Sequence, residues 1–232
     1  MIKQLFIVLA MIGVAWLLYP FLSEFFVPEN VNTLAKDYIQ GSVNDLNMPN
    51  VVTAVVVTYR GLDTLGEVTV LFLATAGVGF LLRKRESSSK KRRQGSEILQ
   101  IGATILTPLI VMFGIYIFIH GHLTPGGGFQ GGVVIASAML LLSLAYTNFH
   151  FSHTLIHWLE SISGVAYVTL GLLGLLLLGV DSFLDPRYLP LGRYLHLFSV
   201  GAVPLIYSAI GIKVGSELSS VIDSLRGKGD EA

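Results

Sequence analysis

The chain contains no cysteine and few charged residues. The lack of Cys among its 232 residues excludes disulfides, thiolate metal sites, iron–sulfur ligation and a catalytic thiol in this chain. Charged residues make up 13% of the sequence, whereas a soluble domain has about 25%. Hydrophobic residues make up 53%, and the mean hydropathy is +0.69. Basic and acidic residues balance at 15 each, which gives no indication of a nucleic-acid partner. The composition predicts a membrane protein.

Long apolar segments predict an all-α integral membrane protein with about six transmembrane helices. A helix needs about 20 mainly apolar residues to cross a bilayer. The first segment follows Lys3, but its apolar run is long and no small-residue cleavage site precedes Glu24, so we expect an uncleaved helix rather than a signal peptide. The predicted spans are residues 4–22, 65–82, 98–119, 129–146, 162–180 and 197–212.

A basic, serine-rich segment predicts both the topology and the division of the chain. Residues 83–93 (RKRESSSKKRR) contain seven basic residues and one acid, and basic loops stay in the cytoplasm. With this loop inside, eleven basic residues are cytoplasmic and four are outside, and both termini are cytoplasmic. We expect residues 1–82 to form a two-helix part, residues 83–94 a linker, and residues 95–232 a four-helix part with a short cytoplasmic tail.

A second apolar run, residues 51–59 (VVTAVVVTY), is too short to span a bilayer. Its β-branched residues would suit a strand, but no partner strand is visible. A short helix at the membrane surface, with Pro49 in its first turn, is the favoured prediction.

Glu67 is a carboxylate within the second predicted span, and ionisable groups inside a membrane segment are candidates for function. Its helical face includes small residues such as Ala74 and Gly77, so we expect it to face a neighbouring helix. Arg60 is seven residues earlier and could pair with it. The alternative is a capping box, in which Thr64 is the N-cap and Glu67 reaches back to its N–H.

Histidines are the next candidates. His120 and His122 precede a glycine-rich loop, where they could pass protons or simply bind loop carbonyls. His150, His153, His157 and Glu160 have helical spacing, which would allow a zinc site if one helix carried all four. Because the chain must turn near residues 148–152, a cytoplasmic-side polar entrance involving His157 and Glu160, or a solvated interface, is favoured over a metal site.

Lys213 closes the last predicted span. We expect its side chain to extend to the cytoplasmic surface, and an i,i+4 pair with Glu217 would explain both residues without a function.

The loop at residues 120–132 (HGHLTPGGGFQGG) lies between two predicted spans. Gly126, Gly128 and Gly131 match G-x-G-x-x-G, but no strand precedes them, so a dinucleotide site is not expected. Two interpretations remain: a tight packing turn, or a loop whose free carbonyls bind a cation such as Na⁺. The loop candidates are Pro125, Gly126, Gly127, Gly128, Phe129, Gly131 and Gly132.

The sequence GHLTPGGGFQGGVVIA resembles the signature of the MnhB-like family, the B-type subunits of Mrp-type multisubunit Na⁺/H⁺ antiporters, over roughly residues 97–213. That family includes a subunit of archaeal membrane-bound hydrogenases and sulfur-reducing complexes. NVVTAVVVTYRGLDTLGEVTVLF, within residues 17–82, resembles the E-like subunit of the same complexes. The resemblance implies two fused subunits, and it gives importance to Glu67, Arg60 and the Pro-Gly loop.

The resemblance further implies a non-redox, multi-pass cell-membrane subunit of a Na⁺/H⁺-translocating module, with other membrane subunits and lipid as partners. Na⁺ would be transported, and we expect no cofactor, resident metal or nucleic acid. The main alternative is a structural scaffold with no ion in its path. An autonomous carrier is disfavoured because we find no internal repeat, and an enzyme because no nucleophile–base pair or metal cage is evident.

Overall fold

The computed structural model describes residues 2–23, 32–83, 94–149, 152–179 and 183–226, and these are organised entirely as helices and connecting turns. The linker at residues 84–93 and His150 lie outside the described residues. The chain divides into two compact units, Met1–Asp37 and Tyr38–Ala232. The first contains α1 (Ile2–Ser23), and α2 (Thr33–Asn44) crosses the boundary between them.

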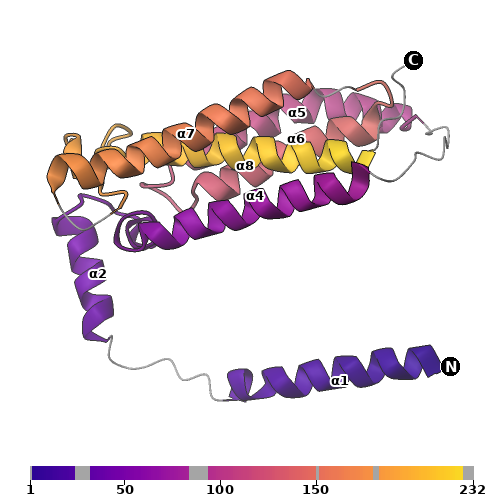
Figure 1. The fold of residues 1–232 in the computed structure, drawn as a ribbon, viewed down its shortest axis with the longest axis horizontal. Helices are drawn as coiled ribbons and strands as arrows, with labels where there is room; N and C mark the ends of the chain where they lie inside the picture. Colours follow the sequence, from indigo (N-terminus) through magenta and orange to yellow (C-terminus); the bar gives the residue numbers. More distant parts are fainter. Residues whose placement is uncertain (1, 24–31, 84–93, 150–151, 180–182, 227–232) are drawn as a thin grey trace. The chain divides into compact units, whose positions relative to one another are not determined.

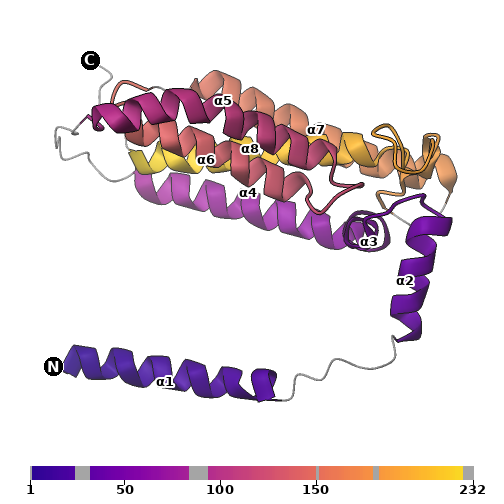
Figure 2. The same ribbon diagram turned by 180° about the vertical axis from the view of Figure 1, so that it is seen from behind.

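Tyr38–Ala232 is built around a bundle of five long helices, shown from two sides in Figures 1 and 2. They are α4 (Gly61–Arg83), α5 (Glu97–Ile119), α6 (Gly128–Ala145), α7 (His153–Leu178) and α8 (Val203–Arg226). In the described part of the chain, these five are long and apolar enough to cross a membrane, and α1 contains a further apolar stretch at residues 7–20. The all-α membrane fold is therefore confirmed, whereas the cytoplasmic placement of both termini stays a prediction.

Helix α8 is the centre of the bundle and contacts α4, α5, α6 and α7. In its most apolar stretch 61% of the residues are buried, compared with 6% in α4. Since α4 precedes the basic linker, the two predicted parts of the chain pack together through α8. The outer surface of the bundle is apolar, as a bilayer or a neighbouring subunit requires.

The last two predicted spans were placed wrongly along the chain. Helix α7 begins nine residues earlier than predicted, at His153, where Ser152 accepts a hydrogen bond from Leu155 N (3.4 Å). Helix α8 begins at Val203, after Gly201 (φ 58°), and continues through Lys213 to Arg226. Pro204 is thus in its first turn and cannot kink it. Hydropathy ended the predicted span near Lys213 because it does not register a neutralising partner one turn away.

Residues 51–59 are helical, so the prediction of a short helix rather than a strand is confirmed. They form α3 (Val51–Thr53) and a π-helix, η1 (Ala54–Tyr59). Asn50 is the N-cap, and its side chain accepts a hydrogen bond from Thr53 N at 3.2 Å. Pro49 therefore precedes the helix instead of occupying its first turn. Thr53, Ala54, Val57 and Thr58 are buried, which fixes this short helix against the rest of the unit.

Candidate ion-pathway site

The glycine-rich loop connects α5 to α6 and is a packing turn. Gly126 (φ 156°) and Gly127 (φ 159°) adopt backbone conformations that other residues rarely take. A Cβ on Gly121 would be 2.6 Å from Cε2 of Tyr207, and one on Gly128 would be 2.6 Å from Cβ of Ile210. These glycines allow the loop and the start of α6 to lie directly on α8.

Further glycines continue this close packing into the membrane. A Cβ on Gly131 would be 2.6 Å from the carbonyl oxygen of Gly114 in α5, and one on Gly132 would be 2.7 Å from Cβ of Val214 in α8. Small residues of this kind let membrane helices approach closely. Phe129, which precedes these two glycines, packs half-buried against the core, and Pro125 is exposed at the turn.

The carbonyls of this loop are bound by side chains from the N-terminal half of the chain. Asn50 Nδ2 donates to the carbonyls of Gly121 (2.8 Å) and Thr124 (2.9 Å). Thr53 Oγ1 donates to the Gly121 carbonyl (2.6 Å), and Tyr207 donates its hydroxyl to Thr53 (3.0 Å). These bonds favour the packing interpretation over a cation site built from free carbonyls. Asn50 and Thr53 were not among the predicted site residues.

The two histidines of the loop have different surroundings. His120 is half-buried, stacks on Tyr116 with ring centroids 4.1 Å apart, and has Nδ1 3.1 Å from the Tyr116 carbonyl oxygen. His122 is completely buried, and its Nε2 lies 3.4 Å from the carbonyl oxygen of His196. Burial is the main cause that lowers the pKa of His122 below 6.5. A role for either in proton transfer stays a prediction.

The two expected roles of Thr64 and Arg60 around Glu67 are wrong. Helix α4 begins at Gly61, so Thr64 lies inside it, and Thr64 Oγ1 donates to the Val56 carbonyl at 2.7 Å. Arg60 pairs with Asp63 (Nε–Oδ2 2.6 Å), and both side chains are mostly exposed. The capping box and the Arg60–Glu67 pair are absent because the helix begins one turn earlier than the sequence suggested.

Glu67 is exposed on the outer face of α4, next to exposed Val70 and Ala74. The buried face of α4 is formed by Gly61, Thr64 and Val68. The expected packing of Glu67 against a helix is thus not found within the described part of this chain, although Glu67 is near enough to buried Tyr167 of α7 to interact electrostatically. The hydroxyl of Tyr167 has no hydrogen-bond partner among the described residues.

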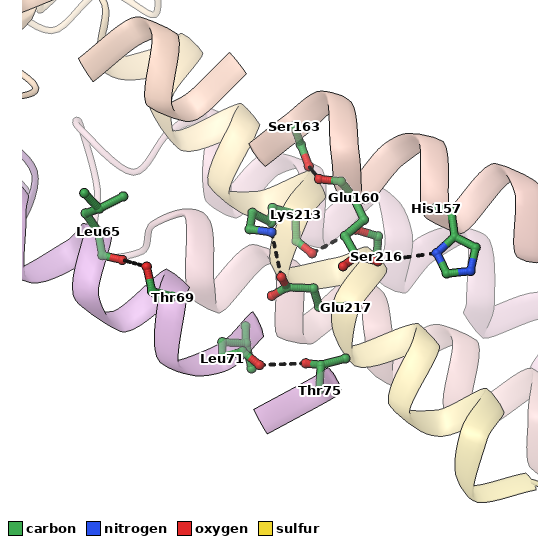
Figure 3. Close-up of polar contacts among 10 residues, drawn as sticks. All are labelled: Leu65, Thr69, Leu71, Thr75, His157, Glu160, Ser163, Lys213, Ser216 and Glu217. Carbon is green, nitrogen blue, oxygen red and sulfur yellow. Dashed lines mark hydrogen bonds and ion pairs between the residues drawn. The ribbon is translucent and has the colours of Figure 1, made fainter. Parts of the chain in front are cut away.

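Lys213 and Glu217 form a buried ion pair in α8, which sequence reasoning treated as a surface feature (Figure 3). Nζ and Oε1 are 2.6 Å apart, and the side chains are 11% and 0% exposed. Lys213 therefore does not extend to the cytoplasmic surface, whereas the i,i+4 pair is confirmed. A lone charge at the centre of a membrane helix costs about 3 kcal/mol on insertion scales. Mutual neutralisation explains how α8 carries both.

Glu160 of α7 lies beside this pair. Its side chain is 17% exposed, its Oε2 is 3.8 Å from Nδ1 of His157, and it interacts electrostatically with Glu217. About two turns nearer the start of α7, His153 Nε2 is 3.4 Å from Asp223 Oδ2. Among the described residues no group of three or more His, Asp or Glu could hold a metal ion.

A second buried carboxylate was missed by sequence reasoning. Asp185 is 1% exposed, caps the 3₁₀ turn η2 (Pro186–Tyr188), and accepts hydrogen bonds from the backbone N (3.0 Å) and Nε (2.9 Å) of Arg187. The Asp-Pro dipeptide was a usable signal, because it favours turn initiation. These contacts stabilise the connection between α7 and α8, which precedes the Lys213–Glu217 pair in the sequence.

Apolar helices, exposed Glu67 and the buried α8 pair define a class: a multi-pass membrane protein with ionisable groups in its spans. Residues 98–220 match the family described as "Domain related to MnhB subunit of Na+/H+ antiporter". Residues 2–95 match the MbhE family, the E-type subunits of MBH. The first match covers more than half of the chain, which belongs to the family of MnhB-related antiporter subunits. The resemblance inferred from the two motifs is confirmed, and the chain is a membrane subunit of an antiporter-like module.

Two similar proteins each cover about four fifths of the chain. An uncharacterized protein of Methanocaldococcus jannaschii is 29% identical over 220 residues, which cover 81% of this chain and 83% of that protein. The probable A/B subunit of a K⁺/H⁺ antiporter of Rhizobium meliloti is 28% identical over 213 residues, but the match covers 79% of this chain and 20% of that longer protein.

Two solved structures share the fold. A chain of the membrane-bound sulfane sulfur reductase, an archaeal respiratory membrane complex, has a TM-score of 0.79 and 41% identity over 97% of this chain and 98% of that chain. A chain of the Mrp complex from Dietzia sp. DQ12-45-1b has a TM-score of 0.72 and 22% identity, over 99% of this chain and 27% of that chain. The second likeness is one of fold.

Proposed function

We propose that this chain is a non-redox subunit of a module that exchanges Na⁺ for H⁺, and that other membrane subunits complete the ion path. Membership of the MnhB-related family supports this exchange chemistry. The 41% identity to a chain of an archaeal respiratory complex supports a place within a redox-driven complex, with a dedicated antiporter as the other setting. The absence of cysteine, and with it of thiolate ligands for an iron–sulfur cluster, supports a non-redox role for this chain.

The observation that carries the proposal is the exposure of Glu67 on a membrane-spanning helix. Glu67 is the seventh residue of the 23-residue α4, so it lies about 9 Å into the helix at about 1.5 Å per residue. A carboxylate facing lipid at this depth would be costly. We infer that a partner subunit covers it and that Na⁺ or H⁺ passes at the shared surface, with Tyr167 behind the carboxylate.

Replacement of the charge tests this role. In inverted vesicles that contain the assembled complex, Glu67→Gln should reduce Na⁺-dependent proton movement by about two orders of magnitude, as expected when a positioned proton-transfer group is removed. Asp63→Asn, on the exposed turn before it, is the matched control and should retain exchange. Assembly is checked by native electrophoresis. Normal exchange with Glu67→Gln would contradict an ion path at this residue.

A structural scaffold is the second candidate, because the glycine contacts and the hydrogen bonds from Asn50 and Thr53 to the glycine-rich loop connect the two halves of the chain. In this case Gly127→Leu should abolish assembly, since a Cβ there would be 2.8 Å from Oε1 of Gln130 and 3.3 Å from Cζ of Tyr207. Gly102→Leu is the control, because no atom lies within 4 Å of a Cβ built on Gly102. A scaffold without an ion path would further require Glu67→Gln to leave exchange intact.

A further inference from the structure

Lys213 and Glu217 are placed where a charge is difficult to keep. Lys213 is residue 11 of the 24 in α8, which puts it about 15 Å from the start of the helix and about 20 Å from its end at about 1.5 Å per residue. Glu217 is one turn further on and is fully buried. Its Oε1 forms an ion pair with the Lys213 ammonium at 2.6 Å, whereas Oε2 has neither an ion-pair nor a hydrogen-bond partner among the described residues.

The hydroxyls near the pair do not satisfy this oxygen. Figure 3 shows that Ser163, Ser216, Thr69 and Thr75 direct their hydroxyls to backbone carbonyls of their own helices. Ser216 Oγ, for example, donates to the Lys213 carbonyl at 2.8 Å. A buried carboxylate oxygen without a donor costs free energy unless it can bind a proton. The second oxygen of Glu217 is therefore available as an acceptor.

Among the four helices that pack against α8, α7 provides Glu160, whose carboxylate interacts with Glu217, and it also carries His153, His157 and Tyr167. Helix α4 carries the exposed Asp63 and Glu67, and ends at Arg83. Helix α6 carries none, and Glu97 of α5 is exposed in the first turn of that helix. On α8 itself, Asp223 is near His153, and Arg226 donates to carbonyls of residues 146, 147 and 149.

We propose that Glu217 is a proton-accepting group inside the membrane, and that its protonation opens the Lys213–Glu217 ion pair. This role rests on the proposed exchange function and adds a second carboxylate to it. The groups are arranged along the contact between α7 and α8. The series begins with His153, at the start of α7, and Asp223, near the end of α8, and continues through His157 and Glu160 to Glu217. A proton delivered by Glu160 is taken up at Oε2 of Glu217, and Glu160 is left as a carboxylate.

The geometry fits a proton better than a sodium ion. Na⁺ requires several oxygen ligands, whereas the described surroundings offer one free carboxylate oxygen with the Lys213 ammonium next to it. A Na⁺ ion bound to this oxygen would lie next to the Lys213 ammonium, and two neighbouring cations repel each other strongly in a medium of low dielectric constant. Protonation needs no further ligand and removes the charge of the carboxylate.

Opening of the pair links the proton to the rest of the module. Once Glu217 is neutral, the Lys213 ammonium has lost its partner, and its Nζ remains 5.3 Å from the ring centroid of Phe72 in α4. The interior then carries one additional positive charge next to α4. That charge disfavours a cation in this region until the proton leaves, which makes proton and cation occupancy mutually exclusive.

A neutral pair separates this role from structural support. Lys213→Met with Glu217→Gln removes both charges at similar volume, and replacement of a buried ion pair by neutral residues commonly preserves folding. In vesicles with the assembled complex, we expect this double variant to assemble but to lose exchange by about two orders of magnitude. Glu97→Gln is the control and should exchange normally. Normal exchange by the double variant would overturn the proposal.

Infrared difference spectra provide an independent test. The purified wild-type complex, titrated from high to low pH, should develop a protonated-carboxyl component that is absent from the spectra of the double variant and shifted in Glu217→Asp, whereas the bands of other carboxyls, such as Glu67 and Glu160, remain in all three. Identical carboxyl bands in the wild type and the double variant would overturn proton uptake by Glu217. This measurement needs no exchange activity. A wild-type complex that shows no Na⁺/H⁺ exchange would refute the proposed function, and the infrared spectra would still decide whether Glu217 takes up a proton.

Discussion

Thr53 donates its hydroxyl proton to the Gly121 carbonyl at 2.6 Å, across 68 residues of sequence. The first residue belongs to the part of the chain that matches one subunit family, and the second to the part that matches the other. Tyr207 of α8 donates in turn to Thr53, so the bond belongs to a short buried chain. The glycine-rich loop is thus one place where hydrogen bonds join the two parts, and the bond from Asn47 Nδ2 to the Gly192 carbonyl (3.1 Å) is another.

Removal of the Thr53 hydroxyl should loosen this junction. Thr53→Val keeps the side-chain shape but deprives Tyr207 of its acceptor and Gly121 of a donor, which should cost about 1–3 kcal/mol. The unfolding midpoint of the purified chain in detergent measures this loss. Thr69→Val is the matched control, because exposed Thr69 donates to the Leu65 carbonyl of its own helix (2.8 Å). Equal shifts for the two variants would contradict a junction at Thr53.

The buried His122 should make the fold sensitive to mild acid. Burial lowers its pKa below 6.5 in the folded chain, so between the two pKa values the unfolded chain binds more protons. Stability therefore rises with pH through this window and falls as the pH drops through and below 6.5. We expect the unfolding midpoint to decrease on acidification in the wild type and to depend less on pH in His122→Gln. A midpoint in His122→Gln that depends on pH as strongly as in the wild type would contradict this assignment.

Loss of the Asp185 charge should destabilise the connection between α7 and α8. Asp185→Asn removes a carboxylate that binds both the backbone N–H and the guanidinium of Arg187. We expect the free energy of unfolding to fall by about 1–3 kcal/mol. The loss is not larger because the Arg187 side chain is 44% exposed, so that solvent screens part of the ion pair. Asp63→Asn breaks the surface-exposed pair with Arg60 and should cost less than about 0.5 kcal/mol. Thermal unfolding of both variants provides the comparison. A larger loss for Asp63→Asn would contradict the structural importance assigned to Asp185.

The apolar spans and the glycine loop could be predicted because both depend on the local amino-acid sequence. Runs of about 20 apolar residues have few alternatives to a membrane helix, and α5 and α6 begin within one residue of their predicted starts. The packing role of the loop was one of two interpretations. Only the Cβ positions at Gly121 and Gly128, directly against Tyr207 and Ile210, decide in its favour.

The roles of charged residues could not be predicted in the same way. Thr64 and Glu67 have the spacing of a capping box, but η1 leads into α4 one turn earlier and leaves Thr64 inside the helix. Lys213 was placed at a surface because it follows an apolar run, although its partner is a single turn away. Whether a charge is paired depends on where a helix begins and ends, and that depends on neighbours distant in sequence.

By itself, the sequence determined that this is an all-α membrane protein, with two family signatures and a glycine turn, because apolar length and backbone freedom are local properties. The tertiary structure alone decided that α8 is central, that Asn50 and Thr53 bind the glycine loop, and that Lys213 and Glu217 are buried while Glu67 is exposed. Burial and pairing are set by the helices that surround a residue, and no single stretch of sequence contains that information.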